Sequence, residues 1–413
     1  MRICFWGAIA LLALCTVHSK IAGLLWGGAF LFAAWMRYRR GPSLKPIDSV
    51  TGAAKLWLVI LIAVLGLWLI SAALFGELLK PQSAEPNAGL RLLIGALAVA
   101  WLVTNARAEC PDRMSSAINA ALTAGCAIAV VIAVTEDRAS YPSNAIVWSA
   151  GLAFWMVILS GEMLRTSLSR QTFLVGVVGV LVAIAAILLS RTRGVYPALL
   201  WPLVLVALAG AQSLRQTAGR RILLVSGMAA CTAIAASVLS GSDPLRLREA
   251  ASDIQEVKQE SDFNSSTGVR VYLLRLGWEA FTESPLIGVG AAERKRRIQS
   301  AGIGEGTEVE QATQSARKLG HVHNAYLHHA MDGGIISLAG FLLTIGGLVY
   351  VGWTLRREHP TSAWQLYGIA FVHAVTNLSS VNFAHNYYPL MLAISVGVVL
   401  IQARLNLLVL QQR

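Results

Sequence analysis

The sequence predicts an all-α integral membrane protein with about twelve transmembrane helices and one large, partly helical loop outside the membrane. Its 413 residues are 55% apolar and only 14% charged, whereas soluble domains carry about 25% charged residues. Apolar runs long enough to cross a bilayer recur along the chain, and one long polar segment, 241–332, interrupts them. These observations exclude a soluble cytosolic enzyme, a secreted disulfide scaffold and a disordered protein.

Each predicted span is an apolar run of roughly 16–22 residues. The first run follows Arg2 and resembles a signal peptide, but a second run begins almost at once and no cleavage site of small residues separates them. We therefore expect both runs to be helices. The twelve predicted spans are 3–18, 20–36, 55–75, 90–104, 115–135, 143–160, 171–190, 194–210, 221–240, 333–354, 362–378 and 387–405.

Lysine and arginine are distributed unevenly between alternate connections. They gather after the even-numbered spans, as Arg39 and Arg40 do after the second. Because such connections stay in the cytoplasm, both termini are expected there and the long polar segment on the opposite side. The expected organisation is helices one to nine in 1–240, an outer loop with amphipathic helices in 241–332, and helices ten to twelve in 333–413.

The outer loop contains a predicted amphipathic helix at 269–282, because its apolar side chains recur at helical spacing. The apolar stripe consists of Val269, Leu273, Leu276 and Ala280. Pro285 ends this helix and the glycines of 288–290 indicate a turn. The net charge of +12 does not indicate nucleic acid, since the basic residues lie mostly between apolar runs.

Arg191 and Arg193 lie in an outer connection, where they depart from the charge asymmetry. A charge at the membrane edge is costly unless it faces water or a partner. These side chains either extend to the lipid headgroups or form an anion site, because the guanidinium is a planar, permanently charged fork suited to phosphate.

Four of the eight histidines, His321, His323, His328 and His329, precede or begin the tenth span. Asn324 is suited to cap this helix, which places His323 at its mouth. An ordinary histidine has a pKa near 6.5 and can act as a general base. A metal site is the rival interpretation, with zinc or manganese at His321 and His323, or at His328 and Asp332 one helical turn apart.

Three motifs together resemble the O-antigen ligase and O-antigen polymerase superfamily. They are SRTRG at 190–194, GVRVYLLRLGWEAFTESPLIGVG at 268–290 and HVHNAYLHHAMDGGI at 321–335. In this family an arginine follows a serine at the outer end of a helix, a second arginine precedes P-L-x-G-x-G, and an H-N pair opens a helix with a G-G step. Arg191, Arg270 and His323–Asn324 occupy those positions.

The resemblance implies a GT-C-like fold in the bacterial inner membrane and a site that faces the periplasm. It implies that a glycan passes from an undecaprenyl-diphosphate donor to a lipid A–core acceptor. Arg191 and Arg270 would stabilise the diphosphate, His323 would deprotonate the acceptor hydroxyl, and Asn324 would orient the imidazole or the sugar. The implied reaction is an inverting displacement. Membrane lipid is a further partner, and we expect no cofactor, no metal and no nucleic acid.

Three neighbouring residues, Arg193, Arg275 and His321, are additional substrate-binding candidates that the resemblance itself does not supply. Ligase activity is favoured over polymerase activity by the number of spans, the single large outer loop and the H-x-H-N cluster. A protein O-oligosaccharyltransferase is a related alternative. A transporter is a different class of protein, and it is disfavoured because the predicted spans are nearly free of charge.

Overall fold

The fold is seen in a computed structural model of the chain. It describes residues 2–40, 48–78, 84–105, 111–165, 169–210, 263–304 and 306–412, together with scattered positions between 222 and 257. The predicted ninth span, 221–240, and the first part of the predicted outer loop therefore lie largely outside the described residues.

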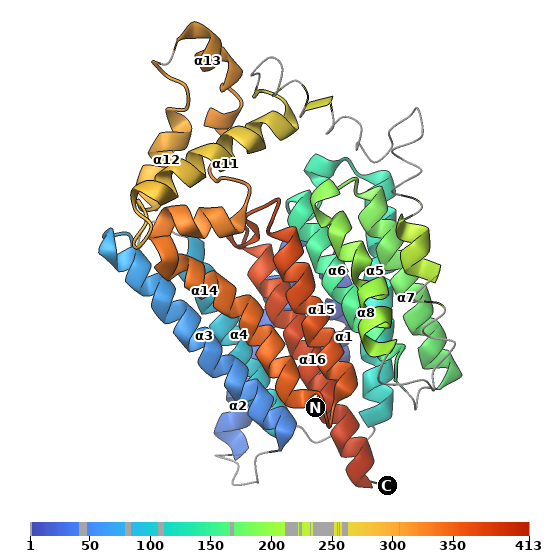
Figure 1. The fold of residues 1–413 in the computed structure, drawn as a ribbon. Coiled ribbons are helices and arrows are strands. Elements are labelled where there is room, and N and C mark those ends of the chain that lie inside the picture. The colour runs from blue at the N-terminus through green and yellow to red at the C-terminus, as the bar shows by residue number, and fades with distance from the viewer. Residues whose placement is uncertain are drawn as a thin grey trace.

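All regular elements of the described residues are helices (Figure 1). In chain order they are α1 (Arg2–Leu14), α2 (Ser19–Arg40), α3 (Ser49–Leu74), α4 (Ala84–Asn105), α5 (Pro111–Thr135), η1 (Arg138–Ser140), α6 (Ala145–Glu162), α7 (Arg170–Leu189), η2 (Arg193–Leu200), α8 (Trp201–Gly210), α11 (Ser266–Glu283), α12 (Ala291–Gln299), α13 (Thr307–Ala312), η3 (Ala316–Lys318), α14 (Ala325–Leu355), α15 (Pro360–Thr376), η4 (Asn382–Ala384) and α16 (Tyr387–Gln412).

Eight of the described helices, α2 to α7, α14 and α16, are long and apolar enough to cross a membrane. They coincide with eight of the predicted spans, which confirms a multi-pass membrane protein. Three further predicted spans correspond to shorter apolar helices, namely α1, the η2–α8 pair and the 17-residue α15. The total of twelve spans stays a prediction.

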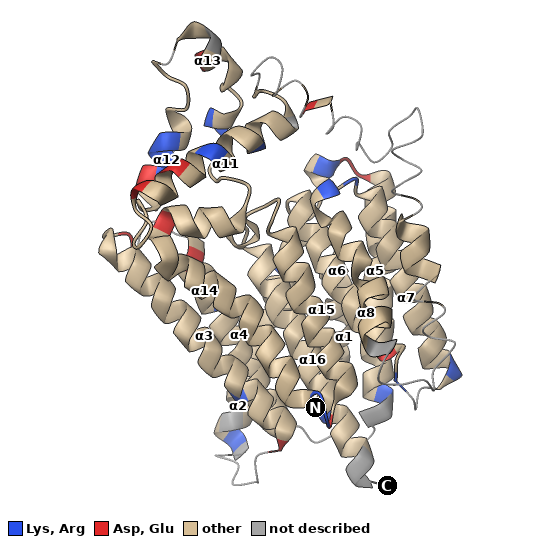
Figure 2. Ribbon diagram, in the orientation of Figure 1, with Lys and Arg blue, Asp and Glu red and all other residues tan. Residues whose placement is uncertain are grey.

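The helices form a bundle around α6, every residue of which is buried. α6 packs against α7, α15 and α16, while α14 packs against α3 and α15. α1 begins and α16 ends at one end of the bundle, and α11 to α13 lie at the other, called here the α11 end (Figure 1). Lysines and arginines gather at the two ends and are scarce along the middle of the helices (Figure 2).

A second, smaller apolar core holds α11 and α12 together at the α11 end. It consists of Val269, Leu273, Ala280, Ile298, Ala301, Ala316, Val322 and Met331. Leu276 packs against this core, so the predicted apolar stripe of 269–282 is confirmed. Because Val322 and Met331 flank the start of α14, the same core joins α11 to the segment that carries His323.

α14 bends at Gly333 and Gly334, whose backbone angles are not helical. The part before the bend lies across the α11 end, and the part after it descends into the bundle (Figure 1). A bend of this kind frees backbone groups from the helical pattern, and they need other partners.

The turn at 285–290 supplies those partners. The backbone bonds run from Val289 N–H to the Met331 carbonyl (2.8 Å), from Gly290 N–H to the Asp332 carbonyl (3.0 Å) and from Ile335 N–H to the Pro285 carbonyl (2.9 Å). A Cβ on Gly288 would lie 2.6 Å from backbone atoms of Gly333 and Gly334. The P-L-x-G-x-G and G-G motifs are thus two halves of one backbone contact.

Replacing Gly334 by alanine is expected to destabilise the protein strongly. Gly334 has a φ of 58°, and a Cβ there would overlap backbone atoms of Leu286 and Ile287. Backbone strain and overpacking together cost about 2–5 kcal/mol. The thermal midpoint of the purified protein measures this loss. Gly346→Ala on the same helix is the matched control, because a Cβ there meets no atom within 4 Å. Equal midpoints for the two variants would contradict the proposed contact.

Candidate functional site at the α11 end of the bundle

Arg191 lies on a tight turn directly after α7. Ser190 and Thr192, on either side of it, are buried. The Ser190 hydroxyl oxygen lies 2.9 Å from the hydroxyl oxygens of both Ser149 and Thr192. This buried hydroxyl cluster fixes the turn and leaves the Arg191 side chain exposed. Within the described part of the chain, its guanidinium has no hydrogen-bond or ion-pair partner.

His323 directly precedes α14, which Asn324 caps. The Asn324 Oδ1 accepts a hydrogen bond from the Leu327 N–H at 3.0 Å, which confirms the predicted cap. The Nδ2 of Asn324 donates to the Leu378 carbonyl at 3.1 Å. This hydrogen bond holds the start of α14, and the preceding His323, against the residues that follow α15.

Arg191 and His323 share an unusual backbone conformation. Among the described residues they are the two non-glycine positions with a positive φ, at 52° and 54°. Left-handed backbone at such residues costs on the order of 1–3 kcal/mol, and it gathers at functional sites where the surroundings enforce it. The two strained positions are residues for which the sequence predicts catalytic roles.

Arg270 on α11 lies among other arginines. Burial lowers the pKa of its guanidinium, and the charges of Arg193 and Arg138 lower that pKa further, while Asp253 opposes them. Burial also raises the pKa of Tyr141, against the opposing charges of Arg138 and Arg191. Arginines from three separate parts of the chain therefore converge at the α11 end.

His323 lies beside these arginines. Burial lowers its pKa to about 4, and the charges of Arg270 and His385 contribute to the shift. The imidazole is therefore neutral at physiological pH, with a lower pKa than the ordinary value expected from sequence. Its Nδ1 is buried and lacks a hydrogen-bond partner among the residues that the structure describes. A neutral imidazole has a free lone pair that can take a proton from a substrate hydroxyl, while the charge of Arg270 disfavours the protonated form.

His321 and His385 complete this cluster of rings. The ring centroid of His321 lies 4.4 Å from that of His323 and 6.1 Å from that of His385. Burial lowers the pKa of His321 to about 2, with a further contribution from His323. Burial lowers the pKa of His385 as well. The three imidazoles form a neutral group near the arginines. We call the arginines and imidazoles together the basic site. It consists of Arg138, Arg191, Arg193, Arg270, His321, His323 and His385.

The structure brings most of the predicted site residues together, with Arg275 as the exception. Arg275 is exposed on α11, and its described ion-pair partner is Glu279 at 2.8 Å. Asn324 uses both polar atoms of its side chain within the protein, in the cap and in the bond to Leu378. The individual roles in catalysis and substrate binding stay predictions.

Sequence reasoning missed Arg138 and His385. Arg138 belongs to the few basic residues in the short outer connections, and the charge asymmetry that drew attention to Arg191 applies equally to it. His385 lies in the short connection between α15 and α16. Nothing in its local sequence indicates that it meets His321, because this contact arises from packing between segments far apart in the chain.

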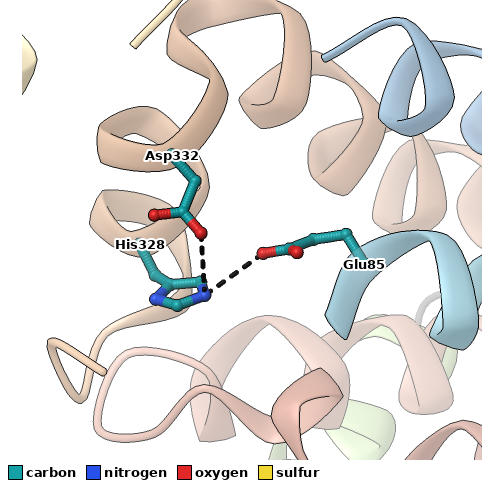
Figure 3. Close-up of side chains that lie close together, drawn as sticks. All are labelled: Glu85, His328 and Asp332. Atoms are coloured by element: carbon teal, nitrogen blue, oxygen red, sulfur yellow. Dashed lines mark ion pairs between the residues drawn. The ribbon is translucent and has the colours of Figure 1, made fainter. Parts of the chain in front are cut away.

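A second polar cluster lies deeper at the α11 end, and we call it the buried ion cluster. It consists of Glu85, Arg294, His328 and Asp332, all less than 8% exposed. His328 Nε2 lies 3.1 Å from Glu85 Oε1 and 3.6 Å from Asp332 Oδ2 (Figure 3). Arg294 donates to Asp332 Oδ1 at 2.6 Å. The sequence predicts two pairs of candidate metal ligands. In the structure, one of these pairs, His328 and Asp332, has a third potential ligand nearby, Glu85.

The fold and the basic site define a multi-pass membrane protein with a strained, positively charged group of residues at one end of a helical bundle. Residues 155–342 match the sequence model of the family described as O-antigen ligase. Over this segment the chain is therefore similar to the O-antigen ligase family, whose members are glycosyltransferase-like ligases and polymerases. The matched segment contains all seven predicted site residues. No curated protein matches the chain.

Proposed function

We propose that this protein is an O-antigen ligase of the bacterial inner membrane. It transfers a glycan from an undecaprenyl-diphosphate donor to a lipid A–core acceptor. The observation that carries the proposal is the meeting of Arg270, Arg193 and neutral His323 at one end of the bundle. A diphosphate leaving group needs fixed cations, and an acceptor hydroxyl needs a base that is free of its proton at neutral pH.

The proposed reaction is a single displacement. The acceptor oxygen attacks the anomeric carbon on the side opposite the diphosphate, and its proton passes to His323. The bond between the anomeric carbon and the diphosphate oxygen breaks, and its electron pair leaves with the diphosphate. Arg191 and Arg270 stabilise the charge that develops on that oxygen. The anomeric configuration is inverted, and the arginines supply the positive charge that a metal ion would otherwise bring.

The α11 end is proposed to face the periplasm. This orientation is supported by the excess of lysine and arginine in the connections of the opposite side, where α1 begins and α16 ends (Figure 1). The donor lipid then stays in the membrane while its diphosphate and glycan reach the basic site beneath α11. Arg193 and His321 are proposed to contact the substrate, whereas the role of Arg275 is at most peripheral.

A lipopolysaccharide gel from a strain that lacks this gene tests the proposal. Loss of the whole ladder with accumulation of donor-linked glycan, restored by the wild-type gene, is the expected result. Core capped by a single repeat would instead indicate a polymerase. An unchanged ladder would contradict both activities and would favour a protein acceptor or a transporter.

A further inference from the structure

The buried ion cluster contains three side chains that converge on one point. Glu85 comes from the first turn of α4, and His328 and Asp332 lie one turn apart before the bend of α14 (Figure 3). One ligand atom from each of these side chains lies within 4.8 Å of the other two. The three residues are between 2% and 7% exposed. The sequence alone pairs His328 with Asp332, and the fold adds the carboxylate of Glu85.

The carboxylates of this cluster outnumber its permanently charged cations. Glu85 and Asp332 are carboxylates, and Arg294 is the cation that contacts Asp332. Glu85 Oε1 and Asp332 Oδ2 are buried and lack a well-aligned hydrogen bond from the residues that the structure describes. Both face His328 Nε2, which forms ion pairs with them only when the imidazole is protonated. Buried carboxylate oxygens normally have donors or a metal ion. A cavity of about 20 Å³ adjoins them, lined by Ser71, Glu77, Glu85, Asp332 and Ser337 among others.

We propose that Glu85, His328 and Asp332 bind a divalent transition-metal ion, with zinc as the ion that fits best. Zinc takes imidazole nitrogen and carboxylate oxygen at about 2.0–2.2 Å in a tetrahedron, which separates neighbouring ligand atoms by roughly 3.3–3.5 Å. The observed separations from His328 Nε2, 3.1 and 3.6 Å, bracket that spacing. The adjoining cavity has room for a water molecule as the fourth ligand.

Arg294 acts as the positioning residue of this metal site. It holds Asp332 Oδ1 at 2.6 Å, which leaves Oδ2 directed at His328 and Glu85. Arg294 also donates to the Gly320 carbonyl. Supporting bonds of this kind orient a metal ligand, and their loss typically weakens metal affinity about 10–100-fold.

The ion adds a polar connection between elements that the apolar cores already bring together. It links α4 to the short helical segment of α14 that begins beside His323, and through Arg294 it reaches α12. Glu77 strengthens the same junction, because its carboxylate accepts hydrogen bonds from the N–H groups of Ala291 and Ala292 at 3.0 and 2.8 Å. The metal stabilises the structure of the α11 end, and it takes no part in the glycosyl transfer proposed above.

The test uses the full-length protein purified in detergent, stripped with a chelator and titrated with zinc chloride. We expect one tightly bound zinc ion per chain and a zinc-dependent rise in the thermal midpoint, on the order of 5 °C. X-ray absorption of the zinc-loaded wild-type protein is expected to show nitrogen and oxygen ligands with a single imidazole. A wild-type protein that binds no zinc, or binds it through two or more imidazoles, overturns the proposal.

Conservative variants locate the ion. Glu85→Gln, His328→Gln and Asp332→Asn are each expected to lower zinc affinity at least tenfold and to abolish the rise in thermal midpoint. Glu162→Gln and His359→Gln are the matched controls, since both residues are buried at the opposite end of the bundle, and they are expected to bind zinc as the wild type does. Unchanged affinity in His328→Gln, or loss of binding in His321→Gln alone, overturns the assignment.

Discussion

Replacing His323 by alanine is expected to lower glycan transfer by about 10²–10⁴-fold, the usual contribution of a positioned general base. The imidazole lies beside Arg270, and burial keeps it neutral, with its pKa lowered to about 4. No other described imidazole of the basic site precedes a capped helix in the same strained conformation. The measurement is the rate of transfer from a lipid-linked donor to a core acceptor by the purified protein.

A second variant separates chemistry from backbone strain. Asparagine tolerates a positive φ better than alanine does, so His323→Asn is expected to fold normally and to be as inactive as His323→Ala. His359→Gln, at the opposite end of the bundle, is the control and is expected to remain active. Full activity in His323→Asn would exclude His323 as the base.

The pH dependence of the transfer rate of the wild-type protein also tests His323 as the base. Because the folded protein holds the His323 pKa near 4, the base is already free of its proton at pH 5. The transfer rate is therefore expected to stay nearly constant from pH 8 to pH 5 and to fall below that. The lowered pKa of His323 also makes stability depend on pH, in the direction opposite to that of a salt-bridged histidine. The unfolded chain binds protons from about pH 6.5 downward, whereas His323 in the folded protein stays neutral there. The folded protein therefore loses stability as the pH falls through that value.

Much of the fold follows from local sequence. The apolar runs predict eight helices that are long and apolar enough to cross a membrane, and the stripe of 269–282 predicts α11 with the face that it buries. The Asn324 cap is likewise a local feature. These predictions succeed because hydropathy and helical periodicity act within one segment and do not depend on its partners. The count of spans stays a prediction where a helix is short, as in α1 and α15.

The site was predictable only in part, because its chemistry depends on distant contacts. The resemblance supplied Arg191, Arg270 and His323, but neither it nor periodicity indicated that Arg138 approaches Arg270. Local sequence does not indicate the third ligand of the buried ion cluster either, since Glu85 lies in the first turn of α4 and meets His328 only after the bundle has formed. The depressed pKa of His323 is also a property of packing.

Arg191→Ala and Arg270→Ala are each expected to slow transfer by about tenfold to a thousandfold. One arginine–phosphate contact contributes about 1.5–3 kcal/mol, and more where water is excluded. Arg270 is half-buried near Arg193, whereas Arg191 is exposed on its strained turn, so the larger loss is expected for Arg270. Lysine at either position keeps the charge but not the planar fork, and Arg270→Lys is expected to recover only a small part of the rate.

The double variant decides whether the two arginines act on one diphosphate. If both stabilise the same leaving group, the loss in Arg191→Ala/Arg270→Ala is smaller than the product of the single losses. The loss is expected mainly in kcat, because negative charge on the leaving oxygen develops in the transition state. Arg296→Ala removes an equal charge from the exposed face of α12, and it is expected to change the rate less than threefold. Strictly multiplicative losses would place the two arginines at separate anions, and the reaction would then need a different cation for its leaving group.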